Sequence, residues 1–190
     1  MGKLFEALDE RSCEFIRSQR IFFVSTAPLA SDGHVNLSPK GLDSFAILGP
    51  LEVAYADFVG SGIETAAHLR ENGRIVFMFC AFDGPPRILR LHGRGEVVEP
   101  GDTAWDALAP RLPAHSDVRA IVRADLERIS DSCGYGIPLY RFESDRPQLV
   151  QWCERKGPEG LRDYVREFGA HSIDGLPALH ARRLGATGPR

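Results

Sequence analysis

The sequence predicts an α+β fold built around a closed or partly closed antiparallel β-barrel. Three observations predict it: about six or seven short β-branched or aromatic segments, short turns between most of them, and one short helix in their midst. Antiparallel strands can be joined by tight turns, whereas parallel strands need long crossovers, usually helical. The scarcity of such crossovers favours a barrel over a layered parallel sheet.

The first half of the chain predicts one amphipathic helix followed by two strand pairs. The helix is indicated by apolar side chains that recur at close to 3.6-residue spacing near the start of the chain. β-branched and aromatic runs then alternate with turn residues, first at Ser31–Gly33 and again at Gly49-Pro50, a pattern typical of hairpins. The expected elements are a helix over Lys3–Ser18 and strands over Ile21–Ala27, Val35–Ser38, Phe45–Leu48 and Glu52–Ala56.

The second half predicts a short helix, two long strands and a largely helical remainder. The pair Asn72-Gly73 ends the short helix, and the double proline in Asp83–Pro86 marks the turn between the two strands. A second pair, Gly157-Pro158, interrupts the helical pattern of the tail. The expected elements are helices over Thr65–Glu71, Asp102–Leu108, Asp117–Ala124, Pro147–Arg155 and Pro158–Glu167, strands over Arg74–Ala81, Ile88–Val98 and Leu139–Glu143, and an irregular segment over Ser130–Ile137.

Composition and charge exclude several classes of function. The net charge of −3 and the scattered basic residues give no indication of a nucleic-acid partner. No stretch approaches the roughly 20 apolar residues that span a bilayer, and no signal-peptide pattern is present, so we expect a cytoplasmic protein with no membrane contact. The four cysteines and six histidines are dispersed, so neither a disulfide framework nor a metal site is expected.

The length of 190 residues is most simply accommodated by one domain, because no repeat or low-complexity segment divides the chain. We expect residues 1–190 to form that domain. Its barrel is expected over residues 18–145, with flanking helical segments over residues 1–17 and 146–190.

A glycine-rich loop, Asp57–Thr65, imitates the start of a dinucleotide-binding unit, with Gly60 and Gly62 after a strand and before a helix. The helix has only about two turns, whereas a parallel crossover needs a dozen or more residues, so this interpretation is disfavoured. The chemistry of the loop remains, because its glycines allow close approach and Ser61 and Thr65 carry hydroxyls beside a helix N-terminus. The loop is either an anion site or simply a tight turn that caps a helix.

Two further segments of the same meander carry cations. Lys40 follows Ser38 and Pro39 at the end of a strand, and Arg87 and Arg90 open the strand after the double proline. A phosphate needs cations, hydroxyls and backbone N–H groups that converge on one point. We therefore expect the functional site where these segments meet; the alternative is that the charges are merely solvated at strand ends.

The order and spacing of three segments point to a known family. The segments are Val35–Asp43, which contains Lys40-Gly41-Leu42-Asp43, then Thr65–Arg74 leading into the strand Ile75–Phe82, and then Arg90–Val97. Between about residues 18 and 100 the chain resembles the pyridoxamine 5′-phosphate oxidase-like superfamily, whose fold is the FMN-binding split barrel. The resemblance implies a homodimer with FMN bound in clefts along the dimer interface.

The resemblance also implies roles for individual residues. By position, Lys40 is similar to the family's basic residue near the FMN phosphate or ring, and Arg87 would lie near the phosphate or ribityl chain. One departure concerns the phosphate clamp of Ser-Arg-Lys type, where this chain has Gly60-Ser-Gly-Ile-Glu64. That departure argues against pyridoxamine 5′-phosphate as the substrate. The expected cofactor-binding residues are Ser38, Pro39, Lys40, Gly41, Ser61, Gly62, Thr65, Arg87 and Tyr135.

Tyr135 is included because an aromatic side chain between two glycines could stack on a flavin ring of a partner subunit. The alternative is a turn with Tyr135 buried at an interface. The neighbouring Cys133 has no His or Asn placed by the sequence to activate it, so a nucleophilic role has little support.

The function expected from the resemblance is a two-electron transfer between FMN and a small organic substrate. Because a flavin supplies the redox chemistry itself, the protein would bind, orient and tune it, and Lys40 with the backbone of Ser38–Gly41 could stabilise the reduced anionic flavin. The sequence singles out no catalytic acid or base. Two alternatives stay open: a non-enzymatic flavin or haem binder, and a deazaflavin-dependent reductase on the same barrel.

Overall fold

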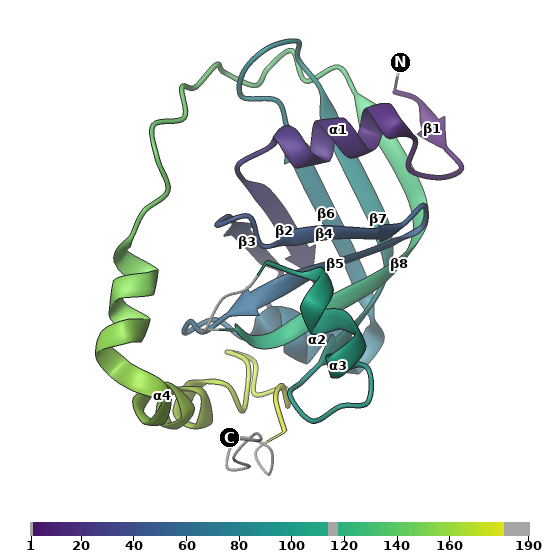
Figure 1. Cartoon of the computed structure of the whole chain (residues 1–190). Coiled ribbons are helices and arrows are strands. Elements are labelled where there is room, and N and C mark those ends of the chain that lie inside the picture. The colour runs from purple at the N-terminus through teal and green to yellow at the C-terminus, as the bar shows by residue number, and fades with distance from the viewer. Residues whose placement is uncertain (1, 114–117, 181–190) are drawn as a thin grey trace.

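The structure is a computed structural model that describes residues 2–113 and 118–180 (Figure 1). It confirms the α+β class, with a curved antiparallel sheet in the order β3-β2-β6-β7-β8-β5-β4 and a short β1 that also pairs with β8. The strands are β1 (Leu4–Phe5), β2 (Phe22–Thr26), β3 (Asn36–Lys40), β4 (Phe45–Gly49), β5 (Glu52–Phe58), β6 (Arg74–Cys80), β7 (Ile88–Val98) and β8 (Val118–Ser132). The helices are α1 (Glu10–Ser18), α2 (Glu64–Asn72), α3 (Trp105–Leu108) with the 3₁₀ turn Ala109–Arg111, and α4 (Gln148–Phe168).

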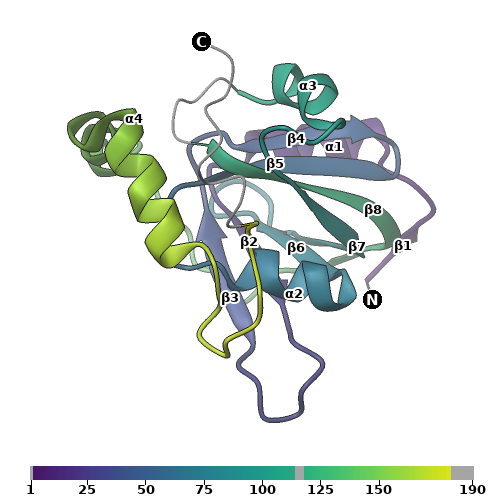
Figure 2. The ribbon, with the colours of Figure 1, turned by 90° about the horizontal axis from the view of Figure 1, so that it is seen from below.

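The barrel is split between its two outermost strands. β3 and β4 stand at opposite ends of the strand order, and within the described chain no ladder joins them. Figure 1 shows α1 across one end of the barrel and α2 across the other, and Figure 2 shows α2 from below. The split therefore leaves the ends of β3 and β5 to be held by side chains.

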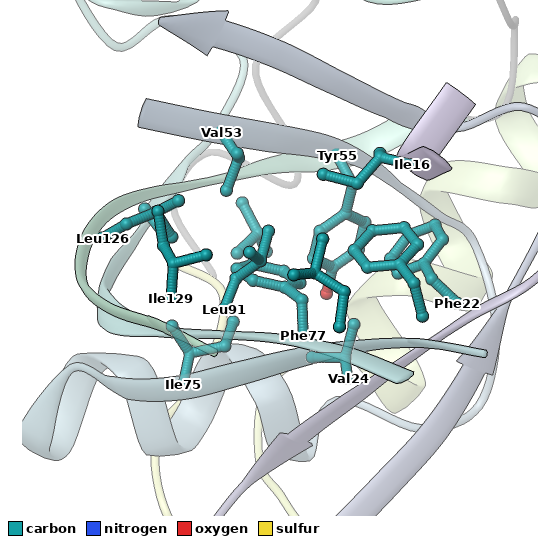
Figure 3. Packing of buried hydrophobic residues seen from close by; sticks show 14 of the residues in the cluster. Ile16, Phe22, Val24, Val53, Tyr55, Ile75, Phe77, Leu91, Leu126 and Ile129 are labelled. Carbon is teal, nitrogen blue, oxygen red and sulfur yellow. The ribbon is translucent and has the colours of Figure 1, made fainter. Parts of the chain in front are cut away.

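The core fills the barrel with aromatic and branched side chains (Figure 3). Strands alternate buried and less buried residues as half-buried strands do, for example along β2. Phe22, Phe45 and Phe79 form edge-on and stacked pairs with centroids 5.0–5.6 Å apart, a favourable aromatic geometry. This packing fills the interior of the barrel.

Three expectations about secondary structure are wrong. The helix expected over Lys3–Ser18 begins only at Glu10, because Asp9 caps it through the backbone N–H of Ser12, and Leu4–Phe5 pairs with β8 instead. The helix expected over Asp117–Ala124 is strand β8, which pairs with both β5 and β7; Asp117 itself lies outside the described residues. The strand expected over Leu139–Glu143 does not form.

The tail forms one interrupted helix that packs beside the barrel. Gly157 has a left-handed φ of 66° and is followed by Pro158, so the expected break between two helical segments is confirmed. The second segment packs Tyr164 and Val165 against a cluster that includes Val59 and Ile63 of the glycine-rich loop. Among the described residues, no helix is both long and apolar enough to cross a membrane.

Candidate functional site

A polar cluster gathers where the barrel is split. It consists of Asn36, Ser38 and Lys40 on β3, Asp57 on β5, Thr65 on α2 and Arg119 on β8. With residues Gly62–Glu64 and Ala66 they line a cleft of about 20 Å³, which has room for about one water molecule. The fold thus brings together the predicted Ser38, Lys40, Gly62 and Thr65.

Asp57 is the centre of the cluster and is paired with two cations. Its carboxylate accepts hydrogen bonds from Lys40 Nζ at 2.9 Å and from Arg119 Nε at 2.8 Å. Burial would raise the pKa of Asp57, but Arg119 and Lys40 together hold that pKa below its ordinary value. The carboxylate is therefore ionised, and the Lys40–Asp57 pair bridges β3 to β5 where no ladder joins them.

Arg119 shapes the glycine-rich loop. Its guanidinium donates to the carbonyl oxygens of Gly60 at 2.7 Å and Gly62 at 2.5 Å, and its side chain is only 4% exposed. The ladder pairs Asp57 with Ala120 and Phe58 with Val118, so Arg119 is the extra residue of a β-bulge. Sequence reasoning missed Arg119 because it assigned this segment to a helix.

A chain of hydrogen bonds runs from the cluster into the barrel wall. Ser38 Oγ donates to Asn36 Oδ1 at 2.8 Å, and Asn36 Nδ2 donates to Thr65 Oγ1 at 2.9 Å and to Thr26 Oγ1 at 3.2 Å. Thr26 Oγ1 also contacts His68 Nδ1 at 2.9 Å. Burial lowers the pKa of His68, which keeps this ring neutral near pH 7. These bonds fix the start of α2 against β3.

Glu64, the first residue of α2, holds its carboxylate beside the N-terminus of the helix. Its Oε2 accepts a hydrogen bond from the backbone N–H of Ile63 at 3.1 Å, and its Oε1 accepts one from the backbone N–H of Ile173 at 3.4 Å. The carboxylate thus joins the residue that precedes α2 to the segment that follows α4. Sequence reasoning quoted Glu64 only as part of a departure from a family motif.

Two larger cavities lie near the cluster. One is an open groove of about 410 Å³ between the glycine-rich loop and α4, and the other is a cavity of about 450 Å³ beyond the end of β3. The groove is lined by Val59, Gly60, Gln148, Leu149, Trp152, Arg155 and Tyr164. The cavity includes Gly41, Phe22, Phe45, Arg20 and Arg111 in its lining. Gly41 follows Lys40 in the chain and Gly60 accepts from Arg119, so each of these spaces begins next to the cluster and is large enough for part of a planar ligand.

The remaining predicted residues lie elsewhere or at the surface. Arg87 donates to Ser12 Oγ at 3.1 Å and lies over the ring of Phe15, so it joins β7 to α1 and is not part of the cleft lining. Tyr135 is 81% exposed. Pro39 and Ser61 are exposed beside the cluster. Cys133 is an exposed free cysteine.

The groups of the cluster can be compared with the parts of a flavin. Lys40, the hydroxyls of Ser38 and Thr65, and the amide of Asn36 supply donors and acceptors of the kind that a ribityl chain and the polar edge of the ring require. Lys40 and Arg119 already face Asp57, and the cleft also holds Glu64, so these four charges sum to zero. The residues fit the uncharged parts of a flavin but offer no excess positive charge to a phosphate.

Comparisons with known proteins agree on one family. A family model described as pyridoxamine 5′-phosphate oxidase matches residues 8–133. The pyridoxamine 5′-phosphate oxidase family protein ustO of Aspergillus flavus is 40% identical over 198 aligned residues, which cover 95% of this chain and 79% of that protein.

Solved structures show the same fold at low identity. A variant of HupZ from Group A Streptococcus has a TM-score of 0.52 at 20% identity, and the match covers 65% of this chain and 98% of that one. A putative pyridoxamine 5′-phosphate oxidase from Lactobacillus delbrueckii has a TM-score of 0.51 at 19% identity, over 67% and 98% of the two chains. At this identity, both similarities concern the fold alone, and they support the split barrel.

Proposed function

Because the chain belongs to the pyridoxamine 5′-phosphate oxidase family, we propose that it is a flavin-dependent oxidoreductase acting on a small organic substrate. The observation that supports the proposal is the polar cluster at the split of the barrel, where Lys40 stands beside the glycine-rich loop and the start of α2. FMN is the form of the cofactor that the resemblance implies. A bound flavin would supply the two-electron chemistry.

The proposed role of the protein's own residues is to bind and orient the flavin. Lys40 is held at 2.9 Å from Asp57 and lies 5.4 Å from the centre of the Tyr55 ring, so its ammonium is fixed in place before any ligand binds. Such preorganisation lowers the entropic cost of binding. Ser38 and Thr65 would donate to or accept from the ligand's polar atoms, and Arg119 would keep the loop in shape. We assign no general acid or base.

We also propose that two copies assemble, as the resemblance implies. The segment between β8 and α4 carries the exposed apolar side chains Leu139, Tyr140 and Phe142, which a partner could cover. The cytoplasmic location and the small organic nature of the substrate stay predictions.

The experiment that tests the function is the visible absorption spectrum of the purified protein, followed by chromatography of what heat releases. We expect a flavin spectrum, and reduction of the bound flavin by a reduced nicotinamide would support an enzyme over a passive binder. A colourless protein that stays colourless on titration with FMN, riboflavin and FAD would overturn the proposal.

Replacing Lys40 by Met tests the assignment of the cluster. Met keeps much of the packing volume but removes the ammonium, so we expect flavin affinity to fall roughly tenfold or more, the usual effect of losing a hydrogen bond from a charged group. The measurement is fluorescence titration with flavin. The exposed Lys3, changed to Met, is the matched control and should bind flavin like the unmodified protein. Equal affinity of the two variants would remove Lys40 from the site.

A further inference from the structure

We propose that Glu64 makes this site insensitive to the phosphate of the flavin, so that riboflavin binds about as tightly as FMN. The inference rests on the proposed function and deepens it, because it names the form of flavin that the site accepts. Glu64 would be a specificity-determining residue. Three observations support this: the charge balance of the cleft, the carboxylate of Glu64 beside the start of α2, and the loop carbonyls that Arg119 holds in place.

The charges around the cleft are already matched. Asp57 and Arg119 have side chains that are each only 4% exposed, and Lys40 donates to the same carboxylate. A phosphate monoester would add about 1.5 to 2 negative charges at neutral pH. With Glu64 also at the cleft, that charge would meet two carboxylates beside two cations. Like charges at such short range oppose binding, and the burial of the pair weakens solvent screening.

The carboxylate of Glu64 lies beside the N-terminus of α2, where an anion would otherwise be favoured. The nine-residue helix α2 presents unpaired backbone N–H groups and partial positive charge at its start, as helices do. The carboxylate folds back over Gly62, so that a Cβ added to that glycine would lie 3.1 Å from Glu64 Oε2. It accepts from the N–H of Ile63 at 3.1 Å. A phosphate at the start of α2 would therefore meet this carboxylate at close range.

A second element holds Glu64 in this position. The backbone N–H of Ile173 donates to its other oxygen, and the next residue, Asp174, binds His34 through both the ring Nδ1 at 2.6 Å and the backbone N–H at 2.8 Å. The segment after α4 is thereby attached to the loop between β2 and β3. Moving Glu64 away from α2 would break its bond to this segment as well.

The carbonyl groups of the glycine-rich loop are also held in place by Arg119. Gly60 and Gly62 cannot turn their carbonyls aside without losing the bonds from Arg119. A phosphate would therefore have no favourable position in the cluster unless the Glu64 carboxylate moved away.

The test compares the dissociation constants of FMN and riboflavin by fluorescence titration. In the unmodified protein the two constants should agree within about threefold. In Glu64→Gln, an isosteric change that keeps an acceptor for Ile63 but removes the charge, FMN should bind about tenfold tighter while riboflavin changes by less than about twofold. Glu14→Gln, on the exposed face of α1, is the matched control and should shift neither constant.

The outcomes separate the two proposals. A preference of tenfold or more for FMN in the unmodified protein, or an equal change for both flavins in Glu64→Gln, would overturn the role of Glu64 and leave the proposed function standing. Failure of both flavins to bind any folded variant would overturn both. If Glu64→Gln does not fold, as judged by circular dichroism, the smaller Glu64→Ala replaces it, with the same expected gain for FMN alone.

Discussion

Asp57 shows at the scale of one residue how the site is stabilised. A buried carboxylate, on a side chain that is 4% exposed, would be unfavourable alone, and it persists because Arg119 and Lys40 donate to its two oxygens. Removing one charge from such a buried group leaves the remaining charges uncompensated. The same carboxylate thus orders β3, β5 and the bulge of β8 around the candidate site.

Changing Asp57 to Asn should therefore destabilise the protein. The two cations would face a neutral amide in a buried place, and we expect the free energy of unfolding to fall by about 3–5 kcal/mol. Denaturant unfolding measures it. The control is Glu96→Gln, because Glu96 also contacts an arginine, Arg123, at 2.9 Å but is 58% exposed, and such pairs contribute about 0–1 kcal/mol. Similar losses in the two variants would contradict the central role of Asp57.

The difference in stability between the unmodified protein and Asp57→Asn should depend on pH with a definite sign. Asp57 has a lowered pKa in the folded protein, so its contribution to stability is complete above the unfolded value of 3.8 and is lost as the pH falls through the lower folded value. The stability gap between the unmodified protein and Asp57→Asn should accordingly be constant near neutral pH and narrow below about pH 4. A gap that widened in acid would contradict the assignment.

At the scale of elements, the long strand β8 decides the architecture. It pairs with β5 along one part and with β7 along another, and β1 joins it as well. Its ladder with β7 shifts register between His92 and Gly93, where the bulge bends the two strands. A Cβ built on Gly93 would lie 2.1 Å from the carbonyl oxygen of Asp125, so only glycine allows this approach.

Replacing Gly93 by Ala should disrupt that crossing. The methyl group would meet backbone atoms of Asp125, which cannot move aside as a flexible side chain does. We therefore expect the free energy of unfolding to fall by about 1–3 kcal/mol or more. Thermal or denaturant unfolding measures it. Gly136→Ala is the matched control, because no atom lies within 4 Å of an added Cβ there. If both variants were equally stable, the close approach at the bulge would not matter to the fold.

At the scale of the whole molecule, the segment after α4 returns to the barrel through charged contacts. His34 and Asp174 are 140 positions apart in the chain and form two hydrogen bonds. Glu99, which is 1% exposed, accepts hydrogen bonds from Arg70 and from His180, through both the backbone N–H and the ring Nδ1 of that histidine. Ala178 and Leu179 are buried between these contacts. Together, these contacts and the two buried residues keep Ile173 beside Glu64.

The His34–Asp174 contact should make this attachment depend on pH. The hydrogen bond and the negative charge of Asp174 raise the pKa of His34 above its ordinary 6.5. The contribution of this contact to the stability of the protein is therefore complete below pH 6.5, and it is lost as the pH rises through the higher pKa of the folded protein. We expect the difference in melting temperature between the unmodified protein and His34→Gln to be largest near pH 6 and smallest in mild alkali. A difference that did not change with pH would show that the ionised ring is not involved.

How far the sequence leads depends on the range of the interactions. The lysine, the hydroxyls and the glycine-rich loop could be predicted, because each has a local chemical signature. Arg119 and the partners of Lys40 could not, because an ion pair between β5 and β8 spans 62 positions and leaves no local pattern. Strand β8 was missed for a related reason: its pairing on both sides outweighs its local helical pattern.

The sequence by itself determined the antiparallel barrel, because alternation and turn residues act over a few positions. It also determined the break in α4 at Gly157-Pro158, where backbone sterics are local. Only the tertiary structure decided that the cations of the site are already paired and that Glu64 also binds the segment after α4. These contacts join residues far apart in the sequence, and the pairing of the cations depends on strand register and on a bulge at Arg119.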